Sequence, residues 1–111
     1  MPPGGEEAAR AFYAGALGLL EVPKPPALAK RGGAWFEAGA VKIHLGVEPG
    51  FTPSAKAHLA LVVDDLDAVL ARCRDAGARL APDDAPLASW RRAYVFDPFG
   101  NRLELMERID G

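Results

Sequence analysis

The order of strand and helix signals in the second half of the chain recurs in the first half, and this repeat constrains the fold more than any other feature. In residues 57–63, hydrophobic positions alternate with other residues, as is typical of a strand. Residues 64–77 follow with hydrophobic positions at helical spacing, an aspartate at the start and a glycine at the end. Three further strand-like segments lie at 79–81, 91–97 and 102–107. The predicted order is therefore βαβββ.

The first half repeats this order without its opening strand. Residues 6–18 predict a helix. Strand-like segments follow at 19–22, 34–37 and 41–47. A shift of 60 residues, chosen to superpose the two halves, places residues 43–45 on residues 103–105. Because the Pro-Pro-Gly-Gly run at 2–5 is a poor strand, we expect the opening strand to be naturally absent, to lie upstream of Met1, or to be replaced by another segment or subunit.

The length and composition of the chain predict one small domain made of these two modules. The chain has 111 residues, which suits a single domain. We expect module one at residues 1–48, a linker at 49–56 and module two at 57–111. The fold class is α+β, because each helix has a hydrophobic stripe that a sheet face must cover.

Charge and cysteine content exclude several kinds of partner and location. The net charge of −2 does not favour nucleic acid, and no hydrophobic run approaches the roughly 20 residues of a membrane helix. The N-terminal residues lack the basic and hydrophobic parts of a signal peptide. The single cysteine, Cys73, falls on the apolar stripe of its helix, so we expect a buried, unreactive thiol. These features predict a cytoplasmic protein without nucleic-acid or membrane partners.

Three polar residues interrupt the alternation of the predicted strands. His44, His58 and Glu104 each lie on the face opposite the hydrophobic row of their strand. If that face is concave, the two imidazoles and the carboxylate converge and can hold a transition metal with open coordination sites. Such a donor set suits Fe, Mn, Ni, Co or Zn better than Ca or Mg. The alternative is that all three side chains are simply solvated.

Four segments of the chain resemble the vicinal oxygen chelate superfamily, which includes glyoxalase I, extradiol dioxygenases and bleomycin- and fosfomycin-resistance proteins. The segments are EEAARAFYAGALGL (6–19), VKIHLGVE (41–48), AHLALVVDDLDAVLARCRDAG (57–77) and YVFDPFGNRLELME (94–107). The resemblance implies two βαβββ modules that form a curved mixed sheet around a cleft, with the helices on the outer face, in a homodimer. It also implies metal ligands on the first and last strand of each module. By position these are His44, His58 and Glu104, while the fourth ligand has no counterpart.

The resemblance implies two kinds of function. The first is a divalent-metal-dependent enzyme of lyase, isomerase or dioxygenase type that acts on a small oxygenated substrate, with Glu104 as its catalytic residue. The second is a metal-free protein that binds an antibiotic or another small molecule. Either function predicts a small-molecule partner, and the reaction itself does not follow from the fold.

Several other side chains are candidates for contact with that small molecule. Either Arg91 or Arg92 should face the cleft, and Arg92 is the predicted anchor for a carboxylate or phosphate; surface charge is the alternative. Tyr94 and Trp35 lie in predicted strands, where each either lines a pocket or packs in the core. Trp90 falls in a predicted loop and is a candidate pocket lid or dimer contact.

Overall fold

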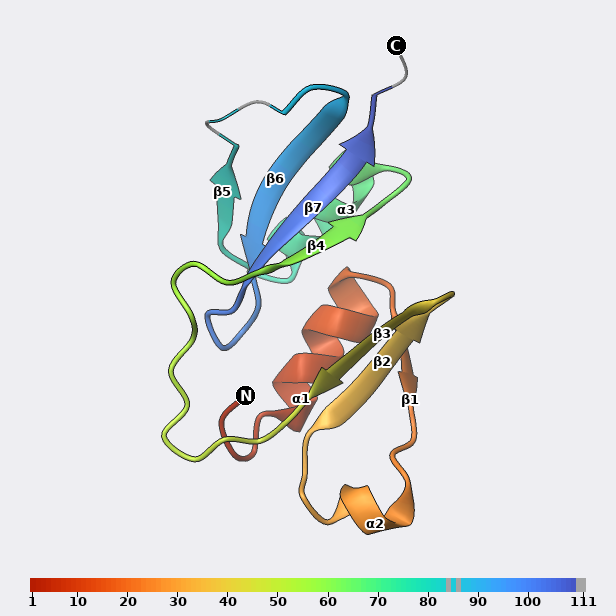
Figure 1. Cartoon of the computed structure of the whole chain (residues 1–111), viewed down its shortest axis with the longest axis vertical. Coiled ribbons are helices and arrows are strands. Elements are labelled where there is room, and N and C mark those ends of the chain that lie inside the picture. Colours follow the sequence, from red (N-terminus) through yellow and green to blue (C-terminus); the bar gives the residue numbers. More distant parts are fainter. Residues whose placement is uncertain (84, 86, 110–111) are drawn as a thin grey trace. The chain divides into compact units, whose positions relative to one another are not determined.

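The computed structural model describes residues 1–83, 85 and 87–109, which form two compact units. Unit 1 comprises Met1–Thr52 and unit 2 comprises Pro53–Gly111 (Figure 1). The boundary falls inside the segment 49–56 that the sequence suggests as a linker. Each unit combines helix with a sheet of its own, so the α+β class is confirmed.

Unit 1 contains a helix packed on a three-stranded antiparallel sheet of order β1-β2-β3. Its elements are α1 (Glu6–Ala9), the π-helical η1 (Arg10–Ala16), β1 (Leu20–Val22), α2 (Pro26–Ala29), β2 (Ala34–Ala38) and β3 (Val41–Leu45). The predicted helix is present as α1 and η1 together, and Gly18 follows it with a φ of +79°. The short α2 is not foreseen by the sequence pattern. It begins with Pro26, which suits the first helical position because proline lacks the N–H that stays unbonded there.

The core of unit 1 lies between η1 and one face of the sheet. Tyr13 stacks on Phe36 of β2 with 5.4 Å between ring centroids, and Phe12 meets Tyr13 edge-on at 5.0 Å. Ile43 of β3 is buried on the same side. Trp35 and His44 alternate with these residues and therefore project from the opposite face.

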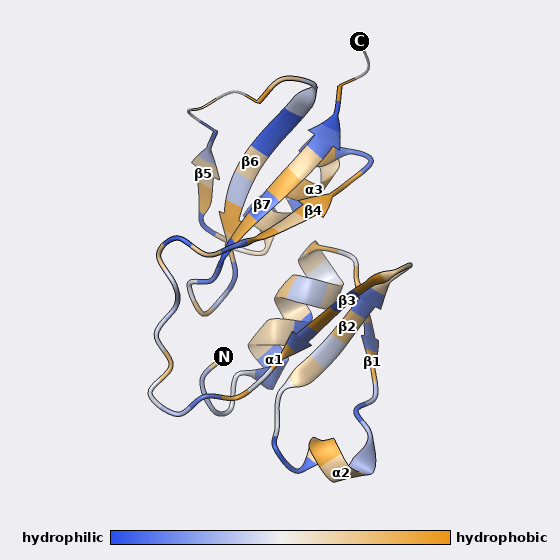
Figure 2. Cartoon of the chain, viewed as in Figure 1, coloured by the Kyte–Doolittle hydropathy of each residue, from blue (hydrophilic) through white to orange (hydrophobic). Residues whose placement is uncertain are grey.

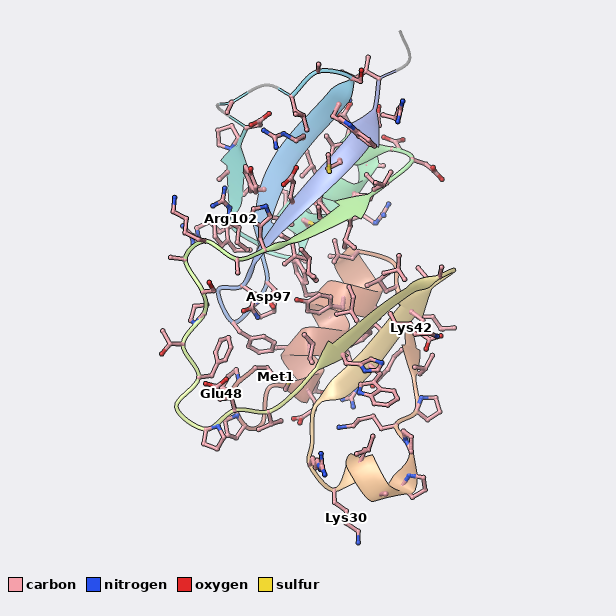
Figure 3. All side chains as sticks on the ribbon, in the orientation of Figure 1. Met1, Lys30, Lys42, Glu48, Asp97 and Arg102 are labelled. Atoms are coloured by element: carbon pink, nitrogen blue, oxygen red, sulfur yellow. The ribbon has the colours of Figure 1, made fainter. Side chains whose placement is uncertain are left out.

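The first residue of the chain is fixed beside the end of β3. The Met1 amino group donates to the Gly46 carbonyl at 2.8 Å, and the Glu48 N–H donates to the Met1 carbonyl at 2.9 Å (Figure 3). Met1 itself is buried. Within residues 1–83, 85 and 87–109, β3 has one strand neighbour, β2.

Unit 2 has the predicted βαβββ order and a mixed sheet. Its elements are β4 (Leu59–Val62), α3 (Leu66–Asp75), β5 (Leu80–Pro82), β6 (Trp90–Phe96) and β7 (Arg102–Arg108). The sheet order is β4-β7-β6-β5, in which β4 runs parallel to β7 and the other pairs are antiparallel (Figure 1). The last strand thus lies between the first strand and β6, which places its central residues in the middle of the sheet.

The two faces of the unit 2 sheet differ in chemistry. Hydrophobic residues are interspersed with hydrophilic residues along β7 (Figure 2). Leu103 and Leu105 are buried on the face covered by α3, whose stripe includes the buried Cys73. Burial raises the pKa of the Cys73 thiol, in keeping with an unreactive cysteine. Within the described residues, no helix combines the length and the apolar character needed to cross a membrane.

A carboxylate ties the start of α1 to the loop before β2 in unit 1. Glu6 accepts a 2.7 Å hydrogen bond from the Gly33 N–H, and this bond holds the pKa of the Glu6 carboxyl below its ordinary value of 4.5. A lowered pKa in the folded state stabilises the fold above pH 4.5, and the effect disappears as the pH falls through the folded-state value.

Replacing Glu6 with glutamine should therefore produce a pH-dependent loss of stability. We expect Glu6→Gln to lower the free energy of unfolding by about 0.5–1 kcal/mol near pH 7, because the bond to Gly33 loses its charge. The difference from wild type should be smaller at about pH 3 than near pH 7, because the stabilisation is lost as the pH falls through the lowered folded-state pKa of the carboxyl. Urea unfolding at both pH values measures this. Glu7→Gln, an exposed neighbour in the same helical turn, is the control, and an equal effect there would contradict the prediction.

Candidate functional site

Glu104 is a buried carboxylate at the centre of the unit 2 sheet. It lies in β7 between Ala60 of β4 and Tyr94 of β6, on the face away from α3. Its residue is 6% exposed, whereas a charged side chain on an open sheet face is normally solvated. A carboxylate held this far from water needs partners that donate hydrogen bonds or carry positive charge.

His58 supplies one of these partners. It directly precedes β4, and its Nε2 lies 3.0 Å from Glu104 Oε1, while its Nδ1 lies 2.9 Å from the Lys56 carbonyl oxygen. A carbonyl oxygen can only accept, so Nδ1 must carry a hydrogen. Nε2 is then the atom that either shares a proton with Glu104 or offers a lone pair. The contact between His58 and Glu104 agrees with the sequence prediction that the two residues lie on the same face of the sheet.

Arg92 supplies the second partner. Its Nη1 donates to Glu104 Oε2 at 3.1 Å, and its Nε and Nη2 donate to the two carboxylate oxygens of Asp83 at 3.2 and 3.0 Å. Nη2 also donates to the Ala85 carbonyl at 2.5 Å. Asp83 is held in place in turn by hydrogen bonds from the Ala85 N–H and the Arg92 guanidinium. The same bonds keep the pKa of the Asp83 carboxyl below its ordinary value.

These contacts determine which way the two arginines point. They surround the Arg92 guanidinium with acceptors of the protein, whereas the sequence predicts that it binds a substrate anion. Arg92 faces Glu104, whereas Arg91 projects to the other face and pairs with Asp67 and Glu107. The guanidinium of Arg92 is engaged by groups of the protein itself. Its predicted role as an anchor for a substrate anion stays a prediction, and it would require exchange of one of these partners.

Aromatic rings and a further arginine border the pair formed by His58 and Glu104. Tyr94 meets the His58 ring edge-on, with 5.7 Å between centroids. The guanidinium of Arg102 lies 3.9 Å from the centroid of the Tyr94 ring. Arg102 is labelled in Figure 3. Sequence reasoning passes over Arg102, although its position two residues before Glu104 puts it on the same face.

The loop placement predicted for Trp90 is wrong. Trp90 is the first residue of β6 and pairs with Arg108 of β7, whose guanidinium lies 5.3 Å from the Trp90 ring centroid. The turn ends one residue earlier, at Ser89, which has a φ of +70°. A large aromatic residue directly after a turn fits the edge of a pleated sheet, and the pattern of prolines and aspartates before it hides the strand boundary. Its role in substrate binding stays a prediction.

The other two candidate residues pair in unit 1. Trp35 and His44 are directly opposite each other in β2 and β3, and their rings stack with 3.7 Å between centroids and 3° between planes. His44 is exposed, and no described residue forms a hydrogen bond with either of its ring nitrogens. The nitrogens lie at the edge of the ring, so the stack leaves them open to a ligand.

Comparison with protein families decides the identity of the fold. The family model described as "Glyoxalase-like domain" matches residues 5–106. The chain belongs to this glyoxalase-like family. No curated protein is significantly similar to it.

Solved structures agree with the family assignment. A glyoxalase family protein from Bacillus anthracis is 45% identical, with a TM-score of 0.90 over 98% of this chain and 88% of that one. TnmS3, an antibiotic binding protein from Streptomyces sp. CB03234, is 24% identical with a TM-score of 0.70, covering 98% of this chain and 91% of its own. The fosfomycin resistance protein FosX from Listeria monocytogenes is 15% identical with a TM-score of 0.71, over 95% and 83% of the two chains. The predicted resemblance to the vicinal oxygen chelate superfamily is confirmed.

The pair of His58 and Glu104 in this glyoxalase-like chain has the donor chemistry of a transition-metal site. Two ligands at adjacent corners of an octahedral metal, each at roughly 2.1 Å, stand about 3.0 Å apart. The observed 3.0 Å between Nε2 and Oε1 is close to this separation and is also the length of an ordinary hydrogen bond between the two side chains. Within the described residues, no group of three His, Cys, Asp or Glu side chains forms a metal-binding cluster, and His44 belongs to unit 1. His58 and Glu104 thus offer two donor atoms of the kinds that transition metals bind.

Proposed function

We propose that the chain is a divalent-metal-dependent enzyme that acts on a small oxygenated substrate. The observation that carries this proposal is the hydrogen bond from His58 Nδ1 to the Lys56 carbonyl. It places a hydrogen on Nδ1 and leaves Nε2 as the ring nitrogen that faces the buried Glu104 carboxylate and could ligate a metal. Histidine ligands of metals are typically oriented by such a bond from their other nitrogen.

Under this proposal His58 and Glu104 would hold the metal, which is Fe, Mn, Ni, Co or Zn, while the role of His44 as a further ligand stays a prediction. When bound, it supplies a Lewis acid that polarises an oxygen of the substrate. Lyase, isomerase and dioxygenase reactions all use such a centre. We also propose that the chain forms a homodimer in the cytoplasm.

The surrounding residues of the chain would tune Glu104 as the catalytic carboxylate. Arg92 holds Oε2 and places a positive charge beside the carboxylate, while Oε1 lies 3.0 Å from His58 Nε2, within the distance over which a general acid or base acts. The Tyr94 ring contacts the His58 ring edge-on. Tyr94, Trp90 and Trp35 are the aromatic candidates for contact with the substrate.

Metal titration tests the proposal directly. Calorimetric titration with Ni²⁺, Zn²⁺ and Mn²⁺ should show binding to wild type. We expect His58→Ala and Glu104→Gln each to weaken binding of the tightest-bound metal by at least about 100-fold, because each removes a ligand. Glu48→Gln, an exposed carboxylate, is the control. Absence of binding to wild type, or equal affinities in all variants, would refute a metal site at these residues.

A second candidate function is metal-free binding of a small molecule or antibiotic. The contact between Arg92 and Glu104 favours it, because protein cations already compensate the buried carboxylate. The likeness in fold to an antibiotic binding protein agrees with it. A thermal-shift screen separates the two candidates: a rise in Tm with organic ligands in the presence of chelator supports binding alone, while a rise with metals supports the enzyme.

A further inference from the structure

Unit 1 contains a pocket that is separate from the residues of the unit 2 pair. Its volume is about 330 Å³, which is at the lower end of the range for small-molecule sites. Its lining comes from the connection between β1 and β2, which includes α2, and from the strands β2 and β3 with the segment that follows them. The side chains that give it chemical character are Lys24, Arg31, Trp35, His44, Leu28 and Val47.

Positive charge dominates the polar part of this pocket. Lys24 and Arg31 both line it, and neither forms an ion pair with any described residue. The Lys24 ammonium donates to the Gly32 carbonyl, which holds the amine at the pocket wall without neutralising it. One carboxylate, that of Glu6, interacts electrostatically with Lys24, and one of its oxygens accepts a hydrogen bond from the Gly33 N–H. Two cations against this one carboxylate leave a net positive charge that favours an anionic ligand on this concave surface.

The remainder of the pocket is formed by two aromatic rings and by aliphatic side chains. The Trp35 and His44 rings stack face to face with 3° between their planes, so each offers its edges and one outer face to a ligand, while Leu28 and Val47 contribute aliphatic contacts. A planar or aliphatic body can pack on such a surface while its charged end meets the cations. A free inorganic anion would use only the cationic part and leave the apolar part exposed to water.

We propose that this pocket binds a small organic anion, such as an aromatic carboxylate or phosphonate, with its anionic group on Lys24 and Arg31 and its body against Trp35 and His44. This proposal deepens the proposed function, because it names the class of small molecule. It does not depend on the metal, since every residue that carries it lies in unit 1.

Fluorescence of Trp35 gives a local readout of this binding. The chain has two tryptophans, so the variant Trp90→Phe leaves Trp35 as the single reporter. In that background, and in the presence of chelator, benzoate and phenylphosphonate should change the fluorescence saturably. Benzamide, which is neutral, and benzamidinium, which is cationic, should bind at least about 10-fold more weakly, because they lack the negative charge. If neither anion binds, or if benzamide binds as tightly, the assignment of an anion site is wrong.

Charge-removing variants locate the anion within the pocket. Lys24→Gln and Arg31→Gln should each raise the Kd for benzoate by about 5-fold or more, since each removes a charged donor. Lys30→Gln is the matched control: it makes the same change one residue before Arg31, and the Lys30 side chain projects from the end of α2 away from the strands (Figure 3). Circular dichroism confirms that each variant is folded. Equal effects of all three changes would indicate a general loss of charge and overturn the proposal.

A last arm separates this inference from the proposed metal site. Glu104→Gln should leave benzoate binding within about 2-fold of its starting value while it weakens metal binding, because the two sets of residues lie in different units. Loss of benzoate binding in Glu104→Gln, with Lys24→Gln unaffected, would place the anion at unit 2 and refute the pocket. A wild type that binds benzoate but no metal would refute the metal site while it supports the pocket.

Discussion

Replacing Gly33 with alanine should lower the free energy of unfolding by at least about 3 kcal/mol, the range expected for a steric overlap combined with backbone strain. Gly33 has a φ of +85°, a conformation that glycine adopts readily but that L-residues adopt only at a cost in free energy. In addition, a Cβ at this position would lie 2.1 Å from the Leu45 carbonyl oxygen, well inside van der Waals contact. The atom in the way belongs to the backbone at the end of β3, so the β2–β3 pairing would have to shift. Urea unfolding followed by circular dichroism measures the loss.

A second glycine of the same unit separates the two causes. Gly39, in the turn between β2 and β3, has a φ of +57°, but no described atom lies within 4 Å of the position that a Cβ would take there. Gly39→Ala should therefore cost only the conformational strain, about 1–2 kcal/mol. If Gly33→Ala destabilises the protein no more than Gly39→Ala, the close approach to Leu45 is relieved without cost and its contribution to the fold is small.

Gly33 also illustrates what the sequence pattern can predict. The strands β2 and β3 that follow it are indicated by the alternation of hydrophobic residues, which places Phe36 and Ile43 on the faces that pack against the helix. The glycine pair at 32–33 indicates a loop. That the Gly33 backbone passes within contact distance of Leu45 depends on the path of the intervening chain, including α2. Prolines at 23, 25 and 26 obscure that helix, since they usually mark irregular structure.

The candidate site was predictable to the extent that it depends on strand alternation. The period of two places Glu104, Arg92 and Tyr94 on one face of the sheet, and the parallel pairing of β4 with β7 brings His58 to Glu104. The partner that fixes Arg92, Asp83, comes from a loop, where side-chain direction has no periodic signal. The stack of Trp35 on His44 depends on the register of a hairpin whose turn spans Gly39, and the sequence alone does not specify that register.

The hydrogen bonds of Glu104 connect these observations to the two candidate functions. Its two oxygens have different partners: Oε1 meets an imidazole that can exchange a proton or lend a lone pair, and Oε2 meets a guanidinium that keeps its charge. A metal site would use the imidazole and Oε1 as ligands, with Arg92 still bound to Oε2. A metal-free binding site uses both as they stand. The measurements on Glu104→Gln and His58→Ala therefore bear on both functions.

Replacing Asp97 with alanine should lower the free energy of unfolding by about 2–3 kcal/mol, because it leaves two part-buried backbone N–H groups and one side-chain amide without their acceptor. Asp97 opens the turn between β6 and β7 and is 5% exposed. Its Oδ1 accepts from the Phe99 and Asn101 N–H groups at 2.9 and 2.8 Å, and its Oδ2 accepts from Asn101 Nδ2 at 2.8 Å. Asp97→Asn can keep the two backbone bonds through its amide oxygen, so its loss should be about half as large. Asp64→Ala, an exposed aspartate, is the control for charge.

The same change should reach the candidate site, because the Asp97 turn sets the register in which Tyr94 faces Glu104. In Asp97→Ala we expect faster amide hydrogen exchange along β6 and β7 than in Asp97→Asn, with the largest increase near the turn. Metal or ligand binding at His58 and Glu104 should weaken in proportion, since those side chains depend on the strand positions. A loss of stability without faster exchange in β7 would show that the turn contributes energy but does not hold the register of the site.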